Sequence, residues 1–138
     1  YETTFEVIKK KVDNIVLIDD SIVRGTTLER SILTMLDRLE PKKIVIVSSA
    51  PQIRYPDCYG IDMSKMKDFV AFRATLQLLK ERGMDDLLEE TYDRCVVALA
   101  TGEASRQNFV RALYEPFTHQ EISRKVAEIV TPRGMQAE

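Results

Sequence analysis

The sequence predicts an α/β fold in which a partial parallel sheet is followed by a mostly helical region. Two runs of four apolar residues, Ile15–Ile18 and Ile44–Val47, have the length and composition of short buried strands. Between them, apolar residues recur at spacings of three and four over residues 28–39, which is the pattern of an amphipathic helix. A strand, a helix and a second strand form a right-handed βαβ unit, so we expect two parallel strands that are buried on both faces.

The second half of the chain has no further strand pattern that stands alone, and we expect it to be helical. The helices predicted there span residues 64–82, 85–92, 105–113 and a last stretch that ends before Pro132. Thr118 and Glu121 have the spacing of a capping box, so we expect the last helix to begin there. Gly83 is expected to end the first of these helices. An apolar run at residues 95–100 is ambiguous in type.

Composition limits the classes of function. The chain has 138 residues, 44% of them hydrophobic and 30% charged, which suits one domain with a packed core. A net charge of −2 argues against nucleic-acid binding through a basic surface. No apolar run approaches the length needed to span a membrane. The two cysteines, Cys58 and Cys95, are far apart, so the simplest interpretation is a reduced, cytoplasmic protein.

The loop after the first predicted strand carries the residues expected to bind a ligand. Asp19 and Asp20 end the strand, and Gly25, Thr26 and Thr27 come just before the helix. The first turn of a helix has backbone amides without partners, glycine lets a ligand approach closely, and the threonines add hydroxyl donors, one of which can cap the helix. These features predict a phosphate site. The two carboxylates would repel a phosphate and instead suit sugar hydroxyls and Mg²⁺.

The segment after the second strand lies at the same carboxyl edge of the predicted sheet, where ligands bind in open α/β folds. Ser48 and Ser49 could hydrogen-bond a substrate or could simply end the strand. Arg54 is a candidate contact for an anion, although a surface arginine is the more common outcome.

The string LIDDSIVRGTT at residues 17–27 resembles the phosphoribosyl pyrophosphate (PRPP) motif of type I phosphoribosyltransferases. Its form is most similar to the one in the glutamine PRPP amidotransferases, the family that catalyses the first committed step of purine synthesis. Residues 48–51 and 55–63 resemble the same family, in the expected order. The resemblance covers about the first half of the chain. It implies that residues 1–63 are a portion of a Rossmann-like phosphoribosyltransferase core with the PRPP loop, and that residues 64–138 pack on it as a helical region.

The resemblance also implies an activity and a role for each residue of the loop. The family converts PRPP, glutamine and water to 5-phosphoribosylamine, glutamate and pyrophosphate. Asp19 and Asp20 would bind the ribose hydroxyls and Mg²⁺. The residues expected to bind the 5′-phosphate are Ser21, Arg24, Gly25, Thr26 and Thr27. None of these residues is expected to act as an acid or base, because the protein mainly positions the reactants.

Partners and completeness follow from the same resemblance. We expect PRPP and ammonia from glutamine as substrates, purine nucleotides as feedback inhibitors, and a homo-oligomer that binds neither nucleic acid nor membrane. The sequence contains no glutaminase domain and lacks the strands that precede the PRPP motif in this fold, so we expect a fragment of a longer chain that is inactive by itself. Some members hold an iron–sulfur cluster, but Asp57 follows Pro56 directly and Cys58 is displaced by one place, so no cluster is predicted.

Three alternatives remain open at this point. A nucleobase phosphoribosyltransferase shares the PRPP loop. A non-catalytic regulatory module could bind PRPP or a nucleotide as a signal. For the acids alone, Asp19 and Asp20 could merely cap a helix, and the glycine and threonines could form an ordinary turn.

Overall fold

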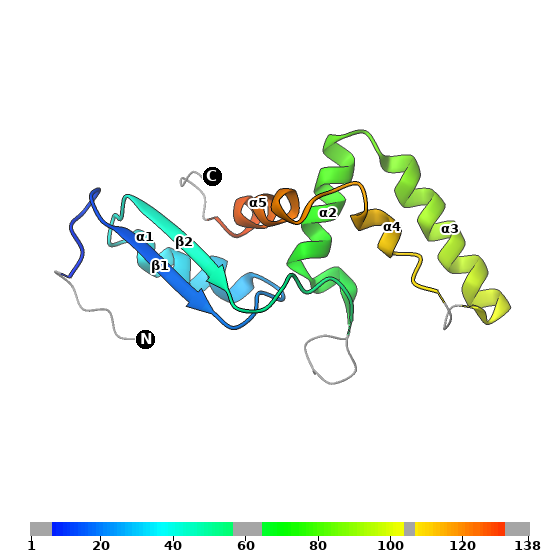
Figure 1. Ribbon diagram of the computed structural model, residues 1–138, viewed down its shortest axis with the longest axis horizontal. Coiled ribbons are helices and arrows are strands. Elements are labelled where there is room, and N and C mark those ends of the chain that lie inside the picture. The colour runs from blue at the N-terminus through cyan, green and yellow to red at the C-terminus, as the bar shows by residue number, and fades with distance from the viewer. Residues whose placement is uncertain (1–6, 57–64, 104–106, 132–138) are drawn as a thin grey trace.

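The computed structural model describes residues 7–56, 65–103 and 107–131 of the chain. A two-stranded sheet with its connecting helix lies at one end of the molecule, and the helices of residues 85–101 and 111–114 lie at the other (Figure 1). The last helix, residues 119–130, lies between them. No helix among the described residues is long and apolar enough to cross a membrane. The boundary predicted between residues 63 and 64 falls outside the described residues, so the division into two domains stays a prediction.

The sheet is the βαβ unit that the sequence predicts. Strands β1 (Asn14–Asp19) and β2 (Lys43–Ser48) are parallel, and their residues pair one to one along the whole of each strand. The connection consists of a π-helical segment, η1 (Leu28–Leu33), which continues directly into α1 (Thr34–Asp37). The π-helical turns were not predicted, because the spacing of the apolar residues fits either kind of helix.

The prediction that both strands are buried on both faces is wrong for the described residues. Burial alternates along each strand, with every second side chain exposed. Val16 and Ile18 on β1 are 59% and 73% exposed, and Val45 and Val47 on β2 are 37% and 44% exposed. The physical reason is that the described helices that pack on the sheet contact only the face formed by the alternate residues, which include Leu17.

Among the described residues, the helical region contains four α-helices. Their bounds are α2 (Val70–Glu81), α3 (Asp85–Thr101), α4 (Arg111–Tyr114) and α5 (His119–Val130). Helix α2 begins six residues later than predicted, since the short 3-10 helix η3 (Met66–Asp68) and the extended Phe69 precede it. The residues predicted as a short acidic helix and as an ambiguous apolar run form one helix, α3. The capping box is confirmed at the start of α5.

Two buried clusters hold these elements together. The first lies among α2, α4 and α5 and includes Leu79, Tyr114 and Ile122. The second joins the helical region to the sheet, and its buried members are Leu28, Leu33, Val70 and Val130. Helices α2 and α5 therefore each contribute one valine to the cluster that supports the loop between β1 and η1.

Candidate functional site

The two aspartates lie where the sequence predicts, at the carboxyl end of β1. The ladder between the strands continues past them, because the Ser49 amide donates to the Asp19 carbonyl (3.0 Å) and the Ala50 amide donates to the Asp20 carbonyl (2.9 Å). The Ser49 hydroxyl also donates to the Asp20 carbonyl (3.1 Å). The structure thus brings Ser49 next to the acidic pair. Its hydroxyl bonds the protein itself, which supports the interpretation that this serine ends the strand.

The carboxylates of the pair are oriented by the backbone. The Asp20 amide donates to Asp19 Oδ1 (2.9 Å), and the Ser21 amide donates to Asp20 Oδ1 (2.6 Å). One oxygen of each carboxylate is therefore held in place by a neighbouring amide. The side chain of Asp20 is exposed, and Asp19 is half-buried. Two adjacent carboxylates on an accessible loop fit Mg²⁺, which commonly uses one or two carboxylates together with substrate phosphates.

The described residues do not assemble a metal site from protein groups alone. No group of three or more histidine, cysteine, aspartate and glutamate side chains within this part of the chain could hold a metal ion. Magnesium at the acidic pair would therefore need oxygen atoms from the ligand. Of the two cysteines, Cys58 lies outside the described residues and Cys95 is a half-buried residue of α3.

The turn before η1 has the geometry expected of a phosphate loop. Gly25 has a φ of +74°, and its carbonyl accepts the hydrogen bond from the Glu29 amide (3.0 Å) that opens the helix. The amides of the residues between them thus lie in the first turn, where a helix has no acceptors of its own. Thr26 and Thr27 are exposed. The predicted cap is not formed, since Thr27, the N-cap residue, makes no capping hydrogen bond.

The remaining two predicted residues, Ser21 and Arg24, are half-buried and lie between the acids and the glycine turn. All seven predicted residues therefore fall within one short stretch of backbone, from the end of β1 to the start of the helix. Their roles in binding PRPP stay predictions.

Gly25 also has a neighbour that the sequence does not reveal. A Cβ atom on this residue would lie 2.8 Å from Val130 Cγ1 and 3.3 Å from Val70 Cγ2. The Val70 amide donates to the Val23 carbonyl (2.8 Å), which ties the start of α2 to the same loop. The space beside the glycine is filled by the protein, so the lack of a side chain here is required by packing as well as by any ligand.

The segment after β2 is anchored to the helical region. Gln52 Nε2 donates to the His119 carbonyl (2.7 Å) and to Ser123 Oγ (2.6 Å), and Gln52 Oε1 accepts from two nitrogens of Arg54 (2.8 and 3.1 Å). The Arg54 guanidinium also lies 5.1 Å from the centre of the Tyr114 ring. Arg54 is therefore engaged in holding this segment, which favours a structural role over contact with an anion. Gln52 carried no sequence signal that would have singled it out.

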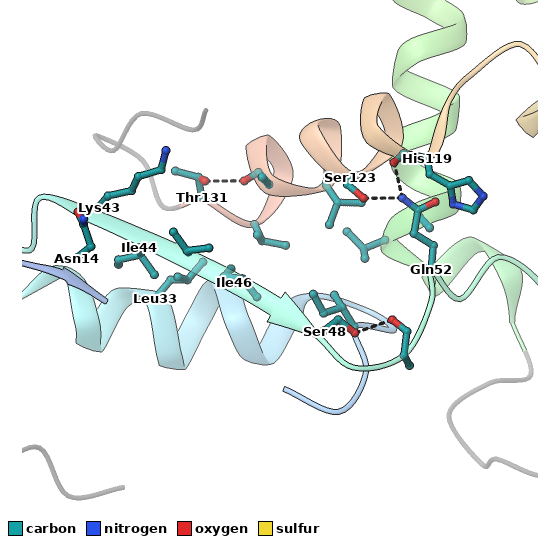
Figure 2. A pocket seen from close by; sticks show the side chains of 18 of the residues that line it. Asn14, Leu33, Lys43, Ile44, Ile46, Ser48, Gln52, His119, Ser123 and Thr131 are labelled. Carbon is teal, nitrogen blue, oxygen red and sulfur yellow. Dashed lines mark hydrogen bonds between the residues drawn. The ribbon is translucent and has the colours of Figure 1, made fainter. Parts of the chain in front are cut away.

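A groove of about 1250 Å³ runs between β2 and α5. Figure 2 shows Ile44, Ile46 and Ser48 along one side of it and, along the other, Ser123 of α5 and Thr131, which follows α5. None of the seven predicted residues lines this groove. The candidate phosphate site is therefore assigned to the exposed side of the loop, where the acids and threonines are accessible. The groove is lined instead by Ile22, Val70 and Val130, which pack behind the loop.

Comparison with known proteins gives one consistent result. The chain is 40% identical over 100 residues to the amidophosphoribosyltransferase of Pasteurella multocida, a match that covers 72% of this chain and 20% of that protein. The amidophosphoribosyltransferase of Haemophilus influenzae is 44% identical over 79 residues, covering 56% of this chain and 15% of that protein. The amidophosphoribosyltransferase of Escherichia coli is 35% identical over 97 residues, covering 70% of this chain and 19% of that protein.

The chain thus spans about a fifth of the length of the curated relatives it matches. No family model matches the chain, and no solved structure matches it. Amidophosphoribosyltransferase is another name for glutamine PRPP amidotransferase, the family that residues 17–27 resemble.

Proposed function

We propose that the chain belongs to the amidophosphoribosyltransferase family, of whose matched members it spans about a fifth, and that it forms the PRPP-binding part of such an enzyme. The reaction would convert PRPP, glutamine and water to 5-phosphoribosylamine, glutamate and pyrophosphate. The observation that carries the proposal is the position of the LIDDSIVRGTT string, which runs from the carboxyl end of β1 through a positive-φ glycine into a helix. That edge of an open α/β sheet is where ligands bind.

The 5′-phosphate would bind at the glycine turn. The first-turn amides and the exposed hydroxyls of Thr26 and Thr27 are hydrogen-bond donors that would bind an anion. The partial positive charge at the start of the helix would strengthen this binding. Ser21 and Arg24 lie in the same stretch and would supply a further hydroxyl and a positive charge. With Gly25 holding the turn open, these residues form the phosphate-binding half of the loop.

The ribose and Mg²⁺ would bind at the acidic pair. Ribose hydroxyls are donors, and ionised carboxylates are acceptors only, so Asp19 and Asp20 suit the sugar. One oxygen of each carboxylate already accepts from the backbone, which fixes the direction in which the other oxygen can reach. Magnesium, when bound, takes up negative charge on the departing pyrophosphate.

The chemistry that this arrangement supports is displacement at the anomeric carbon. Positive charge develops on the sugar ring as pyrophosphate leaves, and Asp19 and Asp20, if bound to the ribose hydroxyls as proposed, would help to stabilise that charge. Holding the phosphate at one end and the hydroxyls in the middle orients the anomeric carbon toward ammonia. No proton transfer is assigned to either aspartate.

The wider proposal concerns the complete enzyme. Glutamine would supply the ammonia, purine nucleotides would inhibit the enzyme by feedback, and the enzyme would act as a homo-oligomer in the cytoplasm. These statements rest on the family resemblance.

An assay of the full-length protein with PRPP and Mg²⁺ tests the proposal. Ammonia replaces glutamine in one arm, and purine or pyrimidine bases are added in others. We expect pyrophosphate release with ammonia and formation of phosphoribosylamine. Release that requires a base would identify a nucleobase phosphoribosyltransferase, and PRPP binding without turnover would identify a regulatory module. Either result would overturn the proposal.

A further inference from the structure

We propose that the last turn of helix α5 positions the phosphate loop, and that Val130 is the positioning residue. This inference rests on the proposed function, because it assigns the loop to the 5′-phosphate of PRPP. It adds a residue from the far end of the described chain to a site that otherwise lies between β1 and η1.

The contact is tight and buried. Val130 is 2% exposed, and its Cγ1 lies 2.8 Å from the position that a Cβ on Gly25 would occupy. Val70, which is 1% exposed, lies beside it with Cγ2 at 3.3 Å from the same position. Two branched side chains from two different helices therefore close on the inner side of the glycine turn. The turn cannot move inward without displacing one of them.

A second contact fixes the loop from the same side. The Val70 amide donates to the Val23 carbonyl (2.8 Å), so the backbone just before the turn is tied to the start of α2. Ile22 packs on the same cluster. The loop therefore has an apolar inner side held by α2 and α5 and an accessible outer side with the threonines.

The position of the turn matters for binding because hydrogen bonds to a phosphate depend on direction. The amides after Gly25 must converge on one anion, and a turn that moves by a few tenths of an ångström misdirects several of them together. Removing the methyl groups of Val130 opens space behind the turn. The loop then samples more positions, and each binding event must restrict it again.

The test compares Val130→Ala with Ile122→Ala in the full-length protein. Ile122 is a suitable control because it is 0% exposed on the same helix but belongs to the cluster among α2, α4 and α5. Both variants lose core packing. We expect only Val130→Ala to raise the KM for PRPP, by roughly three- to tenfold, with kcat within about twofold of wild type. Val130→Thr keeps the branched shape and should retain the wild-type KM although it buries a hydroxyl.

A second measurement does not depend on PRPP. Hydrogen exchange of the amides at residues 25–28 should be faster in Val130→Ala than in Ile122→Ala, after correction for any difference in global stability between the two variants. If Val130→Ala fails to fold, Val70→Ala perturbs the other side of the same contact and is read in the same way. Equal KM values and equal exchange in the test and control variants would overturn the inference. Absence of pyrophosphate release by the wild type would instead overturn the proposed function, and the exchange result would still decide the role of Val130.

Discussion

Replacing Gly25 with alanine should destabilise the protein more than the same change at another positive-φ glycine. Gly83 provides the comparison, because its φ is +65° and nothing lies within 4 Å of the position that its Cβ would occupy. Gly83→Ala should therefore lower the free energy of unfolding only through left-handed backbone strain, which is about 1–2 kcal/mol. Alanine also restricts the unfolded chain, which restores about 0.4–1 kcal/mol. Gly25→Ala has the same strain and also places a methyl group 2.8 Å from Val130 Cγ1. Overpacking of a filled core adds about 1–3 kcal/mol.

Urea unfolding followed by circular dichroism measures both variants. We expect the free energy of unfolding to fall by about 1–3 kcal/mol more for Gly25→Ala than for Gly83→Ala. Adding Val130→Ala removes the methyl group that the new Cβ meets, so the double variant should lose less than the sum of the two single losses. Equal losses at the two glycines, or strictly additive losses in the double variant, would show that α5 does not pack on the loop.

Further predictions concern the ligand side of the loop and the helical region. Asp19→Asn and Asp20→Asn should lower kcat more than they raise the KM for PRPP, because ribose and metal contacts strengthen as pyrophosphate departs; steady-state kinetics with PRPP and Mg²⁺ varied separately checks this, and normal turnover at saturation would contradict it. Thr26→Val should raise the KM for PRPP by roughly ten- to a hundredfold, since a hydrogen bond to a charged group is worth about 1.5–3 kcal/mol. Hydrogen bonds from the Thr118 amide, the Thr118 hydroxyl and the Arg82 side chain, in that order of size, lower the pKa of Glu121 to about 2. The ionised Glu121 therefore stabilises the fold fully above the unfolded pKa of about 4.3, and this stabilisation is lost as the pH falls toward 2. The melting temperatures of wild type and Glu121→Gln should therefore converge over that window, and a constant difference would contradict the assignment. Tyr114→Phe removes a 2.8 Å hydrogen bond to the backbone after β2 and should cost about 1 kcal/mol in urea unfolding.

Features with local physical causes were predictable from the sequence. The apolar runs form β1 and β2, because a short run of four apolar residues between polar turns is typical of a strand. The Thr118 and Glu121 pair formed its capping box because both hydrogen bonds join residues three apart. Gly83 ended α2 in a left-handed conformation, as its lack of a side chain allows. Each of these signals involves only neighbouring residues.

Features that depend on distant partners were not predictable in the same way. Gln52 anchors its segment through His119 and Ser123, which lie far along the chain. The apolar residues of α3 look equally suited to burial, yet Val96 and Leu99 are 47% and 72% exposed because α3 packs through its other residues. An apolar residue reports that burial would be favourable, and it does not report whether another element is present to cover it.

Gly25 shows how both kinds of information meet at one residue. The phosphate site predicted from the sequence requires glycine at the turn, because a ligand must approach the backbone there. The structure adds a second constraint on the opposite side, where Val130 and Val70 occupy the space that a side chain would need. The two constraints are compatible, because Thr26 and Thr27, which are expected to bind the ligand, are exposed, while the side of Gly25 that packs on Val130 and Val70 faces the core. A glycine in a phosphate loop can therefore be required twice. The unfolding free energy measured without ligand reports the packing requirement alone, whereas the KM for PRPP reports both requirements, because the packing also positions the turn.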